Sequence, residues 1–274
     1  AGSGVVNIVG EHAVTHIELD APLTSDIEGI AGPVSHWVHT SMSATDVGAD
    51  AAKAVHAARV APGQVASLML PSDTAWNEGG VVADPIEPTP RPAFDEAQLD
   101  AAIAALDGPE SLLLLGGAAL TEDVLDIAGR IWAKTGWARL GEWANARLGR
   151  GAGRVAVNRV PYPIDLALEK LKPFKRIVLV GARAPIGFFA YPSKPAILTA
   201  EGTDIINLCT TAQDIGGALA ALRDGADAAS TAPAHVAQTA TPDKPTGPLE
   251  PAGIAAALGR TIPEDAIVVD EAIT

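Results

Sequence analysis

Three ionisable residues near the start of the chain have the side chains that proton transfer or metal binding requires. Glu11, His12 and His16 follow an apolar run, residues 5–9, that predicts a strand. Open α/β sheets bind ligands beyond the carboxyl ends of their strands, and a histidine there titrates near neutral pH. We therefore interpret His12 as a candidate general acid or base. A zinc site is the less favoured alternative, because the order E-H-x-x-x-H differs from H-E-x-x-H and no third ligand is evident.

Two glycine turns are candidates for binding a phosphate group. Gly116 and Gly117 lie between a predicted strand and a predicted helix, and Gly181 begins a similar turn that contains Arg183. Backbone N–H groups at such a turn can hold an anion. Neither turn has the G-x-G-x-x-G pattern or the P-loop pattern, so we favour ordinary tight turns and keep a bound nucleotide as the alternative.

A serine-hydrolase site is a weak candidate. Ser25, Asp26 and His36 have the residue types of a catalytic triad, but the chain has no G-x-S-x-G motif. For His36 and the nearby His39, local packing or hydrogen bonding is the better interpretation.

Bulky apolar residues and a cysteine complete the candidates. Trp76 and the group Phe188, Phe189 and Tyr191 indicate packing between domains or the wall of a ligand site. Cys209 lies in a predicted buried strand, where we expect an inert thiol.

The composition excludes several classes of protein. The 274 residues are 48% hydrophobic with a mean hydropathy of +0.21, which indicates a folded chain large enough for more than one core. No apolar run approaches the roughly 18 residues of a membrane span, and the first residues lack the features of a signal peptide. The net charge of −14 argues against a nucleic-acid partner. A single cysteine permits no internal disulfide and favours a cytoplasmic location.

The middle of the chain has the clearest secondary-structure pattern. An unbroken apolar run at 112–115 predicts a buried strand, and apolar residues at helical spacing predict a helix that Thr121 caps. Further strands are predicted at 138–140, 176–180 and 204–209, each separated from the next by a helix or a loop. This alternation predicts a doubly wound, mostly parallel, Rossmann-like sheet.

The flanking regions contain shorter α/β patterns. The first region has predicted strands at 5–9 and 65–70 and a helix over 47–60 that Asp46 caps. The last region has a predicted helix at 251–259 and a strand at 266–269. Segments rich in Gly, Pro, Ala and Thr at 81–93 and 228–250 predict linkers. We therefore expect domains at 1–80, 94–227 and 251–274, of which the first and last are partial.

Four stretches of the chain, taken in order, resemble those of a known family. They are VVNIVGEHAVTHIELDAPLTSDIEGIAGPVSHWV, GQVASLMLPSDTAWNEGG, LLLLGGAAL and VGARAPIGFFAYPSKP. They resemble the thiamine diphosphate-dependent enzymes, in particular the acetolactate synthase large-subunit-like group and benzoylformate decarboxylase. The resemblance implies that residues 1–80 are the second half of a pyrimidine-binding domain, 94–227 a central domain and 251–274 the start of a pyrophosphate-binding domain.

The resemblance also implies a chemistry. Such enzymes are carboligases or decarboxylases of 2-keto acids, they use thiamine diphosphate and Mg²⁺, and they form homodimers or homotetramers. Some central domains of the family bind FAD or ADP and others have lost them, and the sequence does not decide between these states. The resemblance brings Gly10, Glu11, His12 and Glu271 near the active site, with His12 as the catalytic candidate, the other three as cofactor-binding candidates and no metal ligand.

The family motifs that hold the cofactor have no counterpart in this sequence. The activating glutamate lies before the matching region, and the G-D-G…N motif that holds Mg²⁺ and the diphosphate lies after it. We therefore expect these 274 residues to be an inactive fragment of a longer enzyme. The alternative is a non-catalytic, nucleotide-binding α/β protein.

Overall fold

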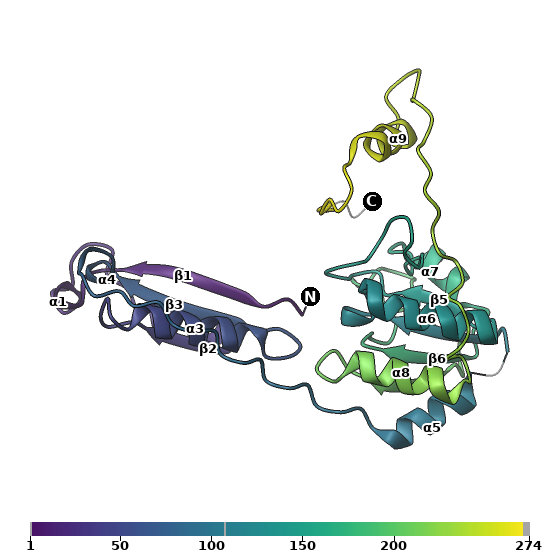
Figure 1. The fold of residues 1–274 in the computed structure, drawn as a ribbon, viewed down its shortest axis with the longest axis horizontal. Helices are drawn as coiled ribbons and strands as arrows, with labels where there is room; N and C mark the ends of the chain where they lie inside the picture. Colours follow the sequence, from purple (N-terminus) through teal and green to yellow (C-terminus); the bar gives the residue numbers. More distant parts are fainter. Residues whose placement is uncertain (1, 107, 271–274) are drawn as a thin grey trace.

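In the part of the chain that the computed structural model describes, residues 2–106 and 108–270, the strands form two separate parallel sheets (Figure 1). The first has the strand order β1-β3-β2 and the second the order β5-β4-β6-β7. All pairings within them are parallel. This arrangement confirms the α/β fold class.

The first sheet has α3 along one face, as Figure 1 shows. The elements of this region are β1 (Val5–Glu11), α1 (Val14–Ile17), α2 (Ile27–Ala31), the 3-10 helix η1 (Gly32–Val34), β2 (Trp37–Thr40), α3 (Val47–Arg59), β3 (Val65–Pro71) and α4 (Asp73–Trp76). The edge strand β2 was not predicted from the sequence. Its residues, WVHT, give no apolar run, and the strand exists because β3 pairs with it.

Small residues let α3 approach the sheet closely. Ala54 and Ala58 are buried and form a core with Ala66 and Leu68 of β3. The prediction that Asp46 caps this helix was wrong in one respect. Asp46 stands at the start of the helix, but its carboxylate accepts a hydrogen bond from Ser43 Oγ at 2.6 Å and none from a helix amide.

The second sheet carries helices on both faces. Its elements are α5 (Glu96–Ala105), β4 (Ser111–Leu115), the 3-10 helix η2 (Gly117–Leu120), α6 (Glu122–Thr135), β5 (Ala138–Gly141), α7 (Ile164–Leu171), β6 (Arg176–Val180), β7 (Asp204–Cys209) and α8 (Ile215–Gly225). Every residue of β4 is buried. Leu113 and Leu115 belong to the core under α5, α6 and α8, while Leu112 and Leu114 belong to the core under α7. The doubly wound prediction is confirmed.

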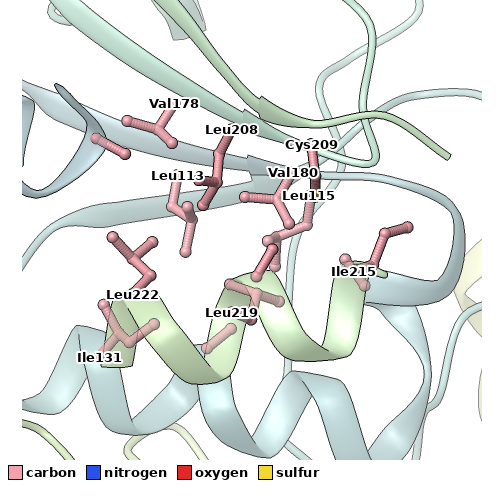
Figure 2. Close-up of a cluster of buried hydrophobic side chains, with 14 of the residues drawn as sticks. Leu113, Leu115, Ile131, Val178, Val180, Leu208, Cys209, Ile215, Leu219 and Leu222 are labelled. Atoms are coloured by element: carbon pink, nitrogen blue, oxygen red, sulfur yellow. The ribbon is translucent and has the colours of Figure 1, made fainter. Parts of the chain in front are cut away.

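Figure 2 shows the larger of these two cores from close up. Apolar side chains of β4, β6 and β7 meet Ile215, Leu219 and Leu222 of α8, together with Ile131 of α6. Fully burying a side chain of this size stabilises the fold by about 1.5–3 kcal/mol. The core therefore fixes where these strands end, and with them the turns beyond their carboxyl ends.

Two aspartates cap helices in this region. Asp95 accepts a hydrogen bond from Ala97 N at 2.9 Å, and Asp214 accepts one from Gly217 N at 3.0 Å. Thr121 does not cap α6, because its hydroxyl donates to Ala118 O at 2.8 Å instead.

The last region has little contact with either sheet. The helix α9 (Pro251–Thr261) has no buried residue. The strand predicted at 266–269 is absent from the described structure, because no neighbouring strand is present to pair with it, and Ile267 is 93% exposed. The segment 228–237, by contrast, contacts the region of the second sheet, because Ala156 N donates to His235 O at 2.9 Å. Among the described residues, no helix is long and apolar enough to cross a membrane.

Candidate functional site

The candidate site lies at the carboxyl end of the first sheet, where β1 and β3 end side by side. Glu11 and Pro71 are partners in the register of these strands. Ser72 then donates to the carbonyl oxygen of Glu11 twice, from its backbone N at 3.0 Å and from its Oγ at 2.9 Å. These bonds hold the loops that follow the two strands next to each other.

The loop after β1 contains the sequence-predicted residues, and the structure brings Gly10, Glu11 and His12 together at this edge. The carboxylate of Glu11 accepts a hydrogen bond from His12 N at 2.7 Å. His12 Nε2 lies 3.1 Å from Pro22 O. Because a carbonyl oxygen only accepts, this contact places a proton on Nε2, so in the neutral ring Nδ1 is the basic nitrogen.

Gly10 leaves space at the end of β1. A Cβ atom built on Gly10 would have no atom within 4 Å. Another group can therefore approach the backbone here without a clash. Glu271 lies outside the described residues.

The structure adds Asp73, which sequence reasoning missed. Asp73 begins α4, directly after β3, and its Oδ1 accepts a hydrogen bond from Val14 N at 3.1 Å. It thus ties the start of α1 to the end of β3. The available signal was its position: a Ser-Asp pair immediately follows a predicted buried strand, where parallel sheets present ligand-binding groups.

A buried carboxylate fixes the neighbouring strand β2, and sequence reasoning missed it as well. Asp50 of α3 is 4% exposed, and its two oxygens lie 3.0 Å from His39 Nε2 and 3.0 Å from Lys53 Nζ. Burial acts to raise the pKa of Asp50, but hydrogen bonds from Lys53, Ser41 and His39 outweigh it and lower the pKa below its ordinary value. His39 therefore bonds locally, as expected.

These groups do not form a metal site or a hydrolase triad. Within residues 2–106 and 108–270, no three His, Cys, Asp or Glu side chains lie close enough together to hold a metal ion. His12 and His16 form no such group with a third residue in this part of the chain. Asp26 caps α2 through Gly29 N at 2.8 Å, and His36 accepts from Val65 N at 3.3 Å, so both are committed to structural bonds.

The glycine turns of the second sheet are required by close packing between backbones. A Cβ on Gly116 would lie 2.4 Å from Gly181 O and 2.8 Å from Ala182 Cα. Gly117 and Gly181 have positive φ angles of 53° and 62°, which glycine adopts without strain. Packing alone therefore explains these glycines, in agreement with the ordinary-turn interpretation.

Comparison with known proteins places the chain. No protein-family model matches it. Over 270 residues it is 39% identical to IlvX of Mycobacterium tuberculosis (strain ATCC 25618 / H37Rv), a protein provisionally named as an acetolactate synthase large subunit. The match covers 98% of this chain and 52% of IlvX. Along nearly its whole length the chain is therefore similar to the acetolactate synthase large-subunit-like group of thiamine diphosphate-dependent enzymes. It spans about half the length of the curated relative that it matches.

Solved structures of thiamine diphosphate-dependent proteins share this fold. A provisionally named thiamin diphosphate-dependent enzyme from Mycobacterium smegmatis has a TM-score of 0.68 and 19% identity, covering 96% of this chain and 54% of its own. A 4-hydroxybenzoylformate decarboxylase from Rhodococcus jostii RHA1 has a TM-score of 0.67 and 17% identity, covering 97% and 54%. Benzoylformate decarboxylase from Polynucleobacter necessarius has a TM-score of 0.62 and 15% identity, covering 97% and 53%. At these identities the likeness establishes the fold.

Proposed function

We propose that the chain is part of a thiamine diphosphate-dependent enzyme that decarboxylates or ligates 2-keto acids. The observation that carries the proposal is the 39% identity to IlvX along 98% of the chain. The names of two structural neighbours, a 4-hydroxybenzoylformate and a benzoylformate decarboxylase, support a 2-keto acid as the substrate class. This likeness is spread over the whole fold, which a generic nucleotide-binding sheet would not explain.

We propose that the chain supplies one edge of the active site and that other residues hold the cofactor. Residues 2–106 and 108–270 contain no group of three His, Cys, Asp or Glu side chains that could hold a metal ion, which supports this division of roles. The chain alone is therefore inactive in this proposal. The complete enzyme would contain Mg²⁺ and assemble as a homodimer or homotetramer, as the family resemblance implies, and the single cysteine fits a reducing cytoplasm.

In this proposal His12 exchanges a proton with the bound 2-keto acid or its product. The ring lies in the loop after β1, and its Nε2 contact with Pro22 O leaves Nδ1 as the basic nitrogen. The Glu11 carboxylate fixes the backbone of the loop through His12 N. The open space beside Gly10 lets a reacting group approach this edge.

The first test compares the product of the complete reading frame with the 274-residue chain. Each protein is titrated with thiamine diphosphate and Mg²⁺ by calorimetry, and decarboxylation of benzoylformate and pyruvate is followed as CO₂ release. We expect binding and turnover only for the complete product. Absence of binding at millimolar cofactor, or turnover by the 274-residue chain alone, would contradict the proposal.

The second test isolates His12 in the complete product. His12→Ala should lower kcat/KM by about 10²–10⁴-fold, the range typical of a lost general acid or base. The matched control is His36→Ala, because His36 is exposed and lies just before β2, at the opposite end of the same sheet. The control should keep its activity, and both variants should keep the wild-type unfolding temperature. Equal activity of the two variants would remove His12 from the mechanism.

A further inference from the structure

The second sheet has a switch point between β4 and β6, where α/β folds commonly bind ligands. These two strands pair with each other. The other neighbour of β4 is β5, and the other neighbour of β6 is β7. The chain therefore leaves the two carboxyl ends in opposite directions. Gly116 N and Gly181 N are bonded to Val180 O and Cys209 O, whereas the backbone N–H groups of Gly117 and Arg183 face this point. In a nucleotide-binding fold, such groups would face a phosphate.

A carboxylate of the chain itself fills this point. Glu142 directly follows β5, and its backbone N donates to Leu115 O, at the end of β4, at 2.8 Å. Its side chain lies against the turn at Gly116, as a Cβ built on Gly116 shows: it would be only 2.6 Å from Glu142 Oε1. Burial raises the pKa of Glu142, while the backbone amides of Arg183 and Gly117 and the Arg183 charge act in the opposite direction. Both turns thus contribute groups that favour an anion, and the anion present is Glu142.

We infer that the Glu142 carboxylate occupies the position of a dinucleotide phosphate at this switch point, so that the second sheet binds no FAD or ADP there. A phosphate would have to displace a tethered anion that already contacts the turns. It would also meet a chain of net charge −14. This inference concerns the second sheet alone and does not depend on the proposed reaction.

The direct test is binding of FAD and ADP to the wild-type protein, measured by fluorescence anisotropy and calorimetry at millimolar ligand. We expect no saturable binding of either ligand. Copurification of FAD, or saturable binding with one ligand per chain, would overturn the inference. This test does not require that any variant folds, and its outcome is separate from thiamine diphosphate binding by the same protein.

The second test removes the internal anion. Glu142→Ala should create a phosphate site, so that inorganic phosphate raises its unfolding temperature by about 2–4 °C. Wild type and the matched control Glu169→Ala, at an exposed glutamate of α7, should not respond. Glu142→Gln keeps the shape of the side chain without its charge, and it should respond less than Glu142→Ala. Equal responses of wild type and both Glu142 variants would refute the internal-anion role.

Discussion

Replacing Gly116 by alanine tests whether the glycine turn of the second sheet is fixed by packing. The added Cβ would lie 2.4 Å from Gly181 O and 2.8 Å from Ala182 Cα, and both are backbone atoms. It would also lie 2.6 Å from Glu142 Oε1, which a side-chain rotation can relieve. Gly116 has a φ of −146°, so alanine adopts its backbone conformation without strain. The cost therefore comes from the overlap between β4 and β6.

The size of the effect follows from these contacts. Overpacking in a filled core typically costs about 1–3 kcal/mol. The two backbone contacts under 3.0 Å can be relieved only by separating the ends of β4 and β6, which also carry the core of Figure 2. We therefore expect Gly116→Ala to lose about 2–3 kcal/mol of the free energy of unfolding, toward the upper end of that range.

The matched control is Gly10→Ala at the end of β1. An added Cβ there meets no atom within 4 Å. Its cost should stay within about 0.5 kcal/mol, as for an ordinary surface substitution. Urea unfolding of both variants is followed by circular dichroism and by tryptophan fluorescence, to which Trp37 of the first sheet and Trp137 of the second contribute. If Gly116→Ala is as stable as Gly10→Ala, the packing explanation of the glycine turn is wrong.

Three further predictions concern buried groups. Asp50→Asn should cost about 1.5–3 kcal/mol at neutral pH, the range for hydrogen bonds to a charged group. Because the folded-state pKa of Asp50 is lowered, its contribution is fully present above the unfolded pKa of 3.8 and is lost as the pH falls below it through the folded-state pKa, so urea unfolding of both proteins should converge at acid pH. Burial raises the pKa of the Cys209 thiol to about 11, so iodoacetamide at pH 8 should alkylate the native protein far more slowly than the urea-unfolded protein. Leu113→Ala should lose about 2–5 kcal/mol of unfolding free energy in urea, because Leu113 is 2% exposed in the main core.

The second sheet could be predicted from the sequence because its strands are buried on both faces. Such strands are apolar at every position, and the four consecutive leucines of β4 fill two cores at once. The edge strand β2 gives no such signal. It is stabilised by pairing with β3 and by the bond of His39 to Asp50, which lies in another element. A strand of this kind can be predicted only when the positions of the elements that contact it are known.

Local patterns failed where a second partner was available. Asp46 and Thr121 occupy the starts of their helices, but Ser43 and the Ala118 carbonyl are nearer to their side chains than the helix amides are. The predicted strand at 266–269 failed for the opposite reason, since no strand in the described structure pairs with it. In both cases the residue types were correct for the element, and the neighbouring groups decided the outcome.

The candidate site could be predicted only in its position along the chain. The rule that ligands bind beyond the carboxyl ends of parallel strands located Gly10, Glu11 and His12 correctly at an edge of the first sheet. The same rule could also have pointed to Asp73, which follows β3, but only the strand order shows that β3 lies next to β1. The tautomer of His12 likewise depends on Pro22 O, which lies in a loop without periodicity.

The two sheets show that the rule for ligand sites beyond the carboxyl ends of parallel strands depends on which side chains occupy that space, and not on the strand order alone. Both are parallel, and both end in loops that contain glycine and charged residues. At the first edge, Gly10 has no atom within 4 Å of an added Cβ, and the nearby His12 keeps a basic nitrogen. At the second edge, the carbonyl of Gly181 and the carboxylate of Glu142 occupy the corresponding space. Because a reacting group needs both room and an uncommitted polar atom, the carboxyl end of the first sheet is where we propose that this chain contributes to catalysis.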